Sequence, residues 1–282
     1  MLQVLKSRLR KFRLVQWCLG LSIVNAIKEG RQLAPFIVKK PDKLMINIGA
    51  GAFNCKNWIN LDYVSDWYAD IHTNVNFMRY DIRNDLIPLG NETVFCAYCS
   101  HVIEHIETPY IEKMFQDVYR ILGGGGYLRL AFPDADFLYN VTLQNSDYWY
   151  WRLGWFKSSL SVDHKKLPGP LDFLVREIAT PKSIFYRWAV NPIDSETLAA
   201  NFRERSPEEF LNFLVDGLKF RADCPGDHIN WWSYEKCKAT LLKAGFKNVI
   251  LSKYKGSVTP YMCGNAFDRT YPRMSCYVEA IK

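Results

Sequence analysis

Apolar runs with the residue types of β-strands recur along the first half of the chain. They are LMINI (44–48), WINLD (58–62), NFMRYD (76–81), TVFCAYCS (93–100) and GYLRLAF (126–132). Turns and helical patterns separate these runs, which is typical of a mostly parallel sheet flanked by helices. Only about nine residues lie between the first two runs, so the helix of that crossover is expected to be a single turn or missing.

Two later segments have the apolar spacing of amphipathic helices. The first, TPYIEKMFQDVYRILGGGG, begins at Thr108 as the expected N-cap and ends at the glycine run from Gly123. The second, SYEKCKATLLKAGF, begins at Ser233 and closes at Gly245. It is followed by the last two expected strands, KNVILSKY and MSCYVEAI.

The segment between these two predicted helices has a different pattern. From about Asp134 to Asp227 the chain is dense in Trp, Tyr and Phe, and it is too long for a plain loop, so a helical insertion or lid is expected. Its segment YWYWRLGWF could stack on sugar rings, cover a pocket, form an interface or pack as ordinary core. The predicted divisions are an N-terminal segment (1–40), the first half of the main domain (41–134), the insertion (135–227) and the second half (228–282).

The first 33 residues predict a helix rich in basic and apolar side chains. Residues 1–30 could rest on an anionic membrane surface, where each Lys or Arg contributes about 1 kcal/mol; packing on the sheet or on a partner chain is the alternative. The apolar stretch 14–27 is too short to span a bilayer, and no secretory signal is evident. Eight scattered cysteines fit a reducing compartment. The expected location is therefore the cytoplasm, with peripheral contact at the inner face of the membrane left open.

Composition and charge narrow the class of protein. Hydrophobic residues make up 49% of the 282 residues and aromatic residues 15%, which permits a sizeable core and argues against disorder. The net charge of +7 is compatible with acidic small molecules, phosphorylated substrates or an anionic membrane, and does not by itself indicate nucleic acid. No nucleic-acid partner is expected, and a homo-oligomer is left open.

Candidate ligand-binding residues follow the expected strands at their carboxyl ends, where ligands bind in open α/β sheets. A glycine turn at 49–51 lets the backbone approach a ligand closely. Asp62 could accept hydrogen bonds from two ribose hydroxyls, and Asp81 could meet an adenine amino group or cap a turn. A dinucleotide oxidoreductase is a weak alternative, because Asn54 stands where the third glycine of that motif belongs.

The sequence gives little sign of metal or redox chemistry. No two close-set ligand pairs occur, so no metal site is predicted. Cys96 and Cys99 form a C-x-x-C pattern, but positions three apart on a strand point to opposite faces, so buried packing is the expected role.

Several blocks of sequence, in a fixed order, resemble a known enzyme family. INIGAG, NWINLD, YDI, SHVIEHI, VYRILGGGGYLRLAFPD and HINWWSYEKCKATLLKAGFKNV are similar to the class I S-adenosylmethionine-dependent methyltransferases. More narrowly, they resemble a bacterial branch of the methyltransferase type 11 group associated with lipopolysaccharide and cell-surface glycan biosynthesis. The match covers roughly residues 43–134 and 228–282. It implies a Rossmann-like α/β fold with a mostly parallel seven-stranded sheet, an antiparallel last strand and a helical insertion after the fifth strand.

The resemblance also implies roles toward S-adenosylmethionine, whose product is S-adenosylhomocysteine. The glycine turn would lie under the methionine part, Asp62 would hold the ribose, and Asp81 with Ile82 would border the adenine. Ser100 and His101 would line the pocket beside the sulfonium. Many members carry an acidic residue where this chain has asparagine, so the contact with the cofactor's ammonium is expected to change. The implied cofactor residues are Asn47, Gly49, Ala50, Gly51, Asp62, Asp81, Ile82, Ser100 and His101.

The expected reaction is O-methylation of a sugar or phosphorylated group during surface-glycan assembly, with a small-molecule or glycan acceptor that is phosphorylated or lipid-linked. An oxygen acceptor needs a base within hydrogen-bond reach, and His101 and His228 are favoured because both lie on the expected rim of the sheet. The full set of candidate bases is His101, His105, Asp134 and His228. Possible contacts to a phosphate are Arg152, Arg176, Arg187 and Arg221. A small-molecule or natural-product methyltransferase and a catalytically silent scaffold of a glycan-synthesis complex stay open as alternatives.

Overall fold

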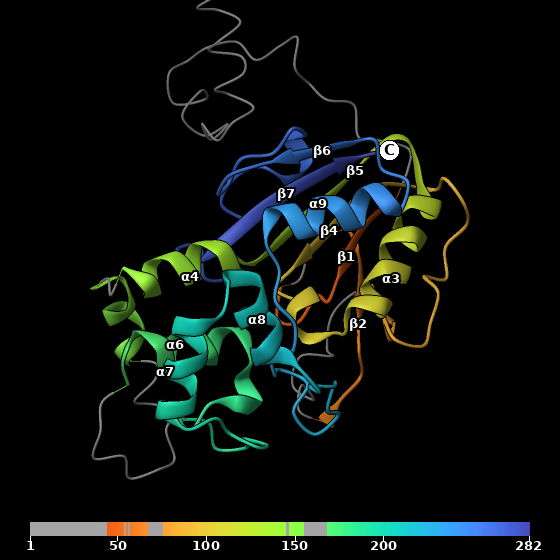
Figure 1. Ribbon diagram of the computed structural model, residues 1–282. Helices are drawn as coiled ribbons and strands as arrows, with labels where there is room; N and C mark the ends of the chain where they lie inside the picture. Colours follow the sequence, from red (N-terminus) through yellow and green to blue (C-terminus); the bar gives the residue numbers. More distant parts are fainter. Residues whose placement is uncertain (1–43, 54, 56, 67–75, 145–146, 155–167) are drawn as a thin grey trace, which may run out of the picture.

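The computed structural model describes residues 44–53, 55, 57–66, 76–144, 147–154 and 168–282 (Figure 1). The expectations for residues 1–40, for Asn54 and for the end of YWYWRLGWF lie outside these residues. The strands are β1 (Leu44–Ile48), β2 (Ile59–Asp62), β3 (Phe77–Arg79), β4 (Val94–Ser100), β5 (Leu122–Pro133), β6 (Asn248–Leu251) and β7 (Ser275–Ile281). The helices are α3 (Thr108–Ile121), α4 (Ala135–Leu143), α6 (Pro170–Ile178), α7 (Ser195–Glu204), α8 (Pro207–Val215) and α9 (Tyr234–Lys243), with short 3-10 turns that include η3 (Ile103–His105) and η4 (Asp147–Arg152).

All seven strands form one sheet in the order β3-β2-β1-β4-β5-β7-β6. The pairs from β3 to β5 are parallel, whereas β7 runs antiparallel to both β5 and β6. The predicted Rossmann-like sheet, with its antiparallel last strand, is therefore confirmed. β1 and β2 pair in parallel although the described residues between them contain no helix, as their short connection predicted.

Both faces of the sheet are covered, which explains the nearly continuous apolar runs of its central strands. On one face lie α3 and α9, side by side in Figure 1, and their apolar residues join the main core with β1, β4 and β5. On the other face a smaller cluster forms around Trp58, Tyr98 and Phe267. Cys96 belongs to this second cluster and Cys99 to the main core, so the two thiols face opposite sides of β4.

The ends of α3 differ from the prediction. Its N-cap is Glu107, whose backbone is extended, and Thr108 is already helical. The glycine run does not separate helix from strand, because β5 begins at Leu122 directly after the helix. Val94 pairs with Leu122 but Cys96 pairs with Tyr127, so the glycines are accommodated as a bulge. Their small size permits the bulge, since a side chain at the last of them would approach a backbone oxygen at 2.8 Å.

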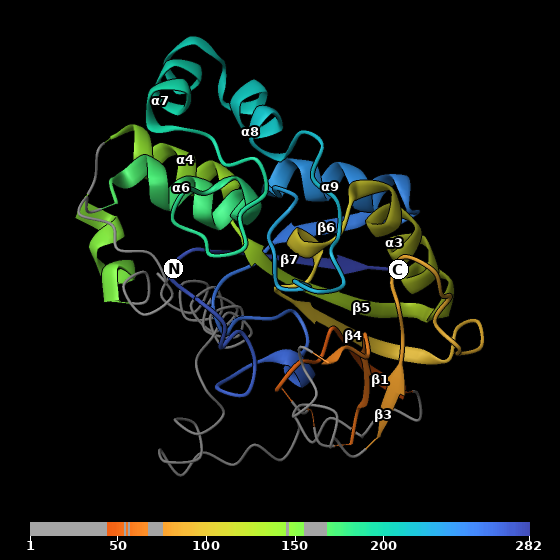
Figure 2. The same ribbon diagram turned by 90° about the horizontal axis from the view of Figure 1, so that it is seen from below.

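The insertion after β5 forms a helical layer beside the sheet (Figure 2). Helices α4, α6, α7 and α8 share a second apolar core with η4. At its centre Trp149 stacks on Phe173, with ring centroids 5.6 Å apart and an interplanar angle of 7°. The indole of Trp149 also donates a hydrogen bond to Thr142. Of the roles predicted for the aromatic segment, Trp149 therefore has the role of ordinary core packing.

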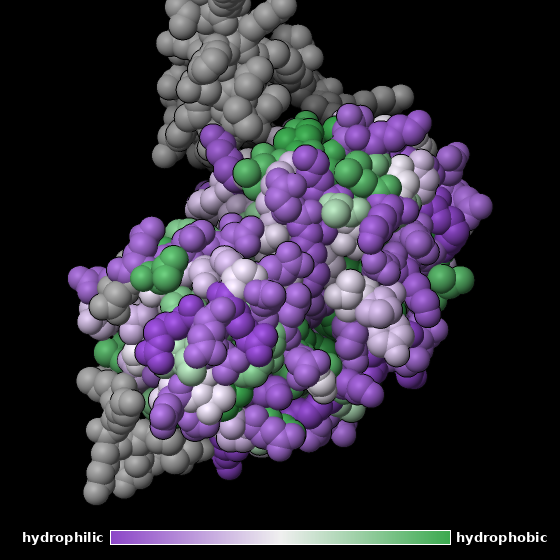
Figure 3. Space-filling model, in the orientation of Figure 1, coloured by the Kyte–Doolittle hydropathy of each residue, from purple (hydrophilic) through white to green (hydrophobic). Residues whose placement is uncertain are grey.

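The outer edge of the sheet exposes apolar side chains. Ile250 and Leu251 of β6 are 37% and 58% exposed, and Figure 3 shows a hydrophobic area in this part of an otherwise largely polar face. Among the described helices, none has the length and apolarity required to cross a membrane.

Candidate functional site

The turn after β1 needs glycine for two reasons: its backbone conformation, and the close approach of a neighbouring side chain. Gly49 and Gly51 have φ angles of +63° and +50°, in the left-handed region that favours glycine. A Cβ on Gly49 would lie 2.2 Å from Val102 Cγ2, whereas one on Gly51 would meet nothing within 4 Å. Gly49 thus lets the segment after β4 pack against the turn, and Gly51 leaves open space beside it.

Asn47 braces this turn from within the sheet. Its side chain is 1% exposed, and its amide donates to the carbonyl of Phe53 at 2.8 Å and to Asn60 Oδ1 at 3.1 Å. The side-chain amide of Asn47 therefore holds the loop after β1 in place.

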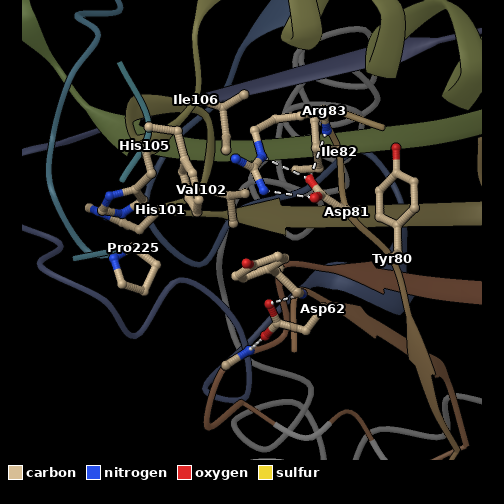
Figure 4. Close-up of a pocket in the computed structure, with 14 residues that line it drawn as sticks. Asp62, Tyr80, Asp81, Ile82, Arg83, His101, Val102, His105, Ile106 and Pro225 are labelled. Atoms are coloured by element: carbon tan, nitrogen blue, oxygen red, sulfur yellow. Dashed lines mark hydrogen bonds and ion pairs between the residues drawn. The ribbon is translucent and has the colours of Figure 1, made fainter. Parts of the chain in front are cut away.

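Two carboxylates lie at the same edge of the sheet: Asp62 is the last residue of β2, and Asp81 follows β3 (Figure 4). Asp62 accepts from the Gly51 amide at 2.6 Å and from the Tyr63 amide at 2.7 Å. Asp81 accepts from Arg83 at 2.7 Å and 3.0 Å and from Asn84 at 2.9 Å. Burial raises the pKa of Asp81, but the hydrogen bonds and charge of Arg83 outweigh it and hold this pKa below its usual value.

Arg83 is a site residue that the sequence did not reveal. Its guanidinium lies 3.8 Å from the centre of the Phe220 ring and 5.3 Å from that of Tyr63. Phe220 comes from the end of the insertion, far along the chain. The cation–π stack therefore joins the insertion to the edge of the sheet where Asp81 lies.

These residues surround two adjoining hollows. The first encloses about 160 Å³ and the second about 460 Å³, and they share Gly49, Gly51 and His101. The first is lined by Asp62, Tyr63, Tyr80, Asp81, Ile82, Arg83, Val102, His105, Ile106, Phe220 and Pro225 as well. The second adds Asn47, Ala50, Ala52, Phe53, Tyr98, Ser100, Ala266, Asp268, Arg269 and Thr270. Every residue expected to contact the cofactor thus lines one hollow or the other.

His101 is held at the junction of the two hollows in a left-handed backbone conformation, with φ of +54°. Its Nδ1 lies 3.0 Å from Glu104 Oε1 and its Nε2 lies 2.8 Å from Ser275 Oγ. Both ring nitrogens therefore have a polar neighbour. A non-glycine residue with positive φ is often found at a functional site.

Three histidines lie around Glu104. We call His101, Glu104, His105 and His228 the Glu104 cluster. His105 and His228 lie with ring centroids 4.8 Å apart, and His105 Nε2 is 4.0 Å from Glu104 Oε1. Burial raises the pKa of Glu104, but its interactions with the histidines outweigh this and lower it to about 2. Burial first, and then the neighbouring His105, lowers the pKa of His228 to about 3.

The remaining candidate base, Asp134, lies elsewhere. It caps α4, where its carboxylate accepts from the Phe137 amide at 3.2 Å. It lines neither hollow. The structure therefore brings together three of the four predicted bases and gives the fourth a capping role.

The order of the strands and the direction of β7 decide the fold. It is the Rossmann-like fold of the class I methyltransferases. No known family matches the sequence, and neither does any curated protein.

Solved structures similar to this chain include three described as S-adenosylmethionine-dependent methyltransferases. One from Thermotoga maritima, described as a possible histamine N-methyltransferase, is 17% identical over 100% of both chains, with a TM-score of 0.42. One from Archaeoglobus fulgidus is 13% identical over 100% of this chain and 95% of that chain, with a TM-score of 0.42. One from Mesorhizobium loti is 16% identical over 85% and 90%, with a TM-score of 0.37. Similarity at this level says nothing about the reaction.

Proposed function

We propose that this protein is an S-adenosylmethionine-dependent methyltransferase. The observation that supports the proposal is the convergence of the glycine turn, Asp62 and Asp81 on one hollow at the carboxyl ends of β1, β2 and β3. Carboxylates at this edge of an α/β sheet suit the hydroxyls of a ribose, and a turn without side chains suits close approach of a ligand.

The residues around the hollow support a position for each part of the cofactor. Asp62 would accept hydrogen bonds from the ribose hydroxyls in place of the Gly51 amide that it now binds. Asp81 and Ile82 would border the adenine, close to the aromatic ring of Tyr63. The methionine part would extend over the turn toward the second hollow, which begins at Gly49 and His101.

The chemical step requires mainly alignment. Bound S-adenosylmethionine would supply an activated methyl group for in-line transfer to an acceptor oxygen, with the electron pair of the broken carbon–sulfur bond left on sulfur to give S-adenosylhomocysteine. Because the sulfonium is already activated, positioning and exclusion of water supply most of the rate. The proton of the acceptor leaves to solvent through the first hollow, which His101 and His105 of the Glu104 cluster line.

We also propose an anionic acceptor, a phosphorylated sugar or related group of surface-glycan assembly. The second hollow is bordered by Arg269, which is exposed, and Arg273 lies exposed beside it. Two of the arginines considered from the sequence are instead used internally: Arg152 pairs with Glu177 and Arg221 with Asp227, each at 2.6 Å. Arg269 is thus the guanidinium best placed for a phosphate.

Calorimetric titration with S-adenosylmethionine and S-adenosylhomocysteine tests the cofactor. We expect micromolar binding by the wild-type protein and at least about 100-fold weaker binding by Asp62→Ala, because hydrogen bonds to a carboxylate contribute strongly. Asp66→Ala is the matched control, since this nearby aspartate is exposed and lines neither hollow. A folded protein that binds neither compound, or an Asp62→Ala variant that binds as well as the control, would contradict the proposal.

A methyl-transfer assay with chromatographic detection tests the acceptor. We expect turnover with phosphorylated sugars to exceed that with the same sugars lacking phosphate, and Arg269→Ala to raise KM for the phosphorylated acceptor about 10-fold with little change in kcat. Lys253→Ala, which removes an exposed cation that lines neither hollow, serves as the control. Equal use of both sugars, or methylation of a different class of metabolite, would refute this part of the proposal.

A further inference from the structure

Glu104 is a buried carboxylate whose nearest polar neighbours are histidine rings. It is 2% exposed, and its second oxygen, Oε2, has no hydrogen-bond partner. Its nearest polar neighbours are the rings of His101 and His105, at 3.0 Å and 4.0 Å. Taking an ionised carboxylate out of water is costly unless both of its oxygens are compensated, so a cation beside Oε2 is expected.

The hydrogen bonds of His105 and His228 fix which ring nitrogen is free. His105 Nδ1 lies 2.9 Å from the carbonyl of Asp227, and His228 Nδ1 lies 2.5 Å from the carbonyl of Glu177. Because a carbonyl can only accept, each Nδ1 must carry the hydrogen. In a neutral ring Nε2 then holds a lone pair. A backbone carbonyl on the far nitrogen is the usual support of a histidine that ligates a metal.

The backbone holds these side chains in place before any ion binds. The amide of His228 donates to Thr180 Oγ1 at 3.1 Å, and its carbonyl accepts from the Thr180 amide at 3.0 Å. The next residue, Ile229, donates its amide to the carbonyl of Glu104 at 2.9 Å. The segment that carries His228 is thus tied directly to the residue that carries the carboxylate.

We propose that Glu104, His105 and His228 bind a first-row divalent metal ion such as Zn²⁺ at the wall of the first hollow. One ligand atom from each of the three residues lies within 4.8 Å of the others. Bonds of about 2.0–2.2 Å to a metal place ligand atoms about 3–4 Å apart, so small side-chain movements close the site. Two imidazoles and a carboxylate favour zinc, iron or manganese over magnesium or calcium.

His101 acts as a positioning residue for this site. It bridges Ser275 and Glu104 with its two ring nitrogens, which orients the carboxylate toward His105 and His228. A ligating carboxylate supported in this way is typical of metal centres.

The role of the ion rests on the proposed methyl transfer. Three protein ligands leave coordination positions open, and His105 lines the hollow where the cofactor would bind. An acceptor hydroxyl on the ion would lose its proton to solvent more readily, as bound water does when its pKa falls to about 7 on zinc. The resulting alkoxide would attack the methyl carbon, and sulfur would keep the electron pair. This predicts an oxygen acceptor rather than an amine.

Titration of the chelator-treated full-length protein with Co²⁺ and Zn²⁺ at fixed pH tests the site. We expect one Co²⁺ per chain, with visible d–d bands and no near-ultraviolet thiolate band, and competition by Zn²⁺. Glu104→Gln and His228→Gln should each weaken binding at least about 10–100-fold, with circular dichroism reporting that they remain folded. Asp62→Ala is the matched control, because it alters the cofactor hollow and leaves all three ligands intact.

The outcomes separate this inference from the proposed function. Metal binding that is lost in both variants supports the site, whether or not S-adenosylmethionine binds. Absence of Co²⁺ and Zn²⁺ binding overturns it, and so does equal binding by His228→Gln, which would assign the ion to other histidines. Cofactor binding without metal binding would refute the metal site and leave the methyltransferase proposal intact. Metal binding without cofactor binding would do the reverse.

Discussion

Replacing Asp268 by alanine is expected to lower the free energy of unfolding by about 3–5 kcal/mol, because it removes the nearest partner of a buried charge. The charge is that of Arg129, at the centre of β5 and 0% exposed. Arg129 donates to Asp268 at 2.5 Å and 3.1 Å. Its other acidic neighbour, Glu279, is more distant, at 3.5 Å. Burial lowers the pKa of Arg129, but Asp268 outweighs this and raises it, so the guanidinium keeps its charge.

Urea unfolding followed by circular dichroism measures this effect. The control is Asp223→Ala, which removes an exposed carboxylate and should change stability by less than about 0.5 kcal/mol. Adding Arg129→Met to Asp268→Ala should recover part of the loss, since the guanidinium that lost its nearest partner is then absent. A loss as small as that of the control would mean that Arg129 finds enough compensation in Glu279 and in its bonds to Ser252 and the Lys253 carbonyl.

Gly49→Ala is expected to abolish measurable cofactor binding and to destabilise the fold. The left-handed backbone alone costs a residue with a side chain about 1–2 kcal/mol. The clash at 2.2 Å with Val102 Cγ2 adds to this, because something in the turn or in the segment after β4 must move. Since the two sides of the clash are walls of the first hollow, the movement changes the shape of the proposed site.

Two further variants divide this effect into its parts. Gly51→Ala meets the same backbone cost without a clash, because nothing lies within 4 Å of the added atom, and it should shift thermal unfolding by a smaller amount. Gly49→Ala combined with Val102→Ala removes the methyl groups that clash and should recover some stability and some calorimetric binding of S-adenosylmethionine. If the double variant is no better than Gly49→Ala, the conformational cost and not the contact dominates.

The main sheet could be predicted because its signals are local. β1, β2 and β3 come from short apolar runs, with Gly49, Asp62 and Asp81 at or just after their carboxyl ends, and the carboxyl ends of parallel strands meet at one edge of the sheet. For this reason Gly49, Asp62 and Asp81 could be placed together without any long-range information. The start of α3 and the structure of the glycine run were predicted less well. They depend on the pairing of β4 with β5 and not on local composition.

The rest of the site depends on contacts between distant segments. Phe220 reaches Arg83, and Asp268 and Arg269 border the second hollow, from parts of the chain whose sequence shows no local pattern. The proposed metal site also depends on contacts between distant segments. The Glu-His pair at 104–105 holds two ligands, but the third, His228, is brought to it by the backbone bond between Ile229 and Glu104. A search for two close-set pairs could not find such a set.

The antiparallel insertion of β7 between β5 and β6 has a consequence for synthesis of the chain. The edge of β5 that will pair with β7 has no partner until residues 275–281 have left the ribosome. The whole helical layer is synthesised before that point. During that interval a long apolar strand presents unpaired amides and carbonyls to other nascent chains, which is a known route to aggregation. Yield in the cell should therefore depend on what shields β5 before β7 arrives, and slower translation of the helical layer would lengthen the exposure.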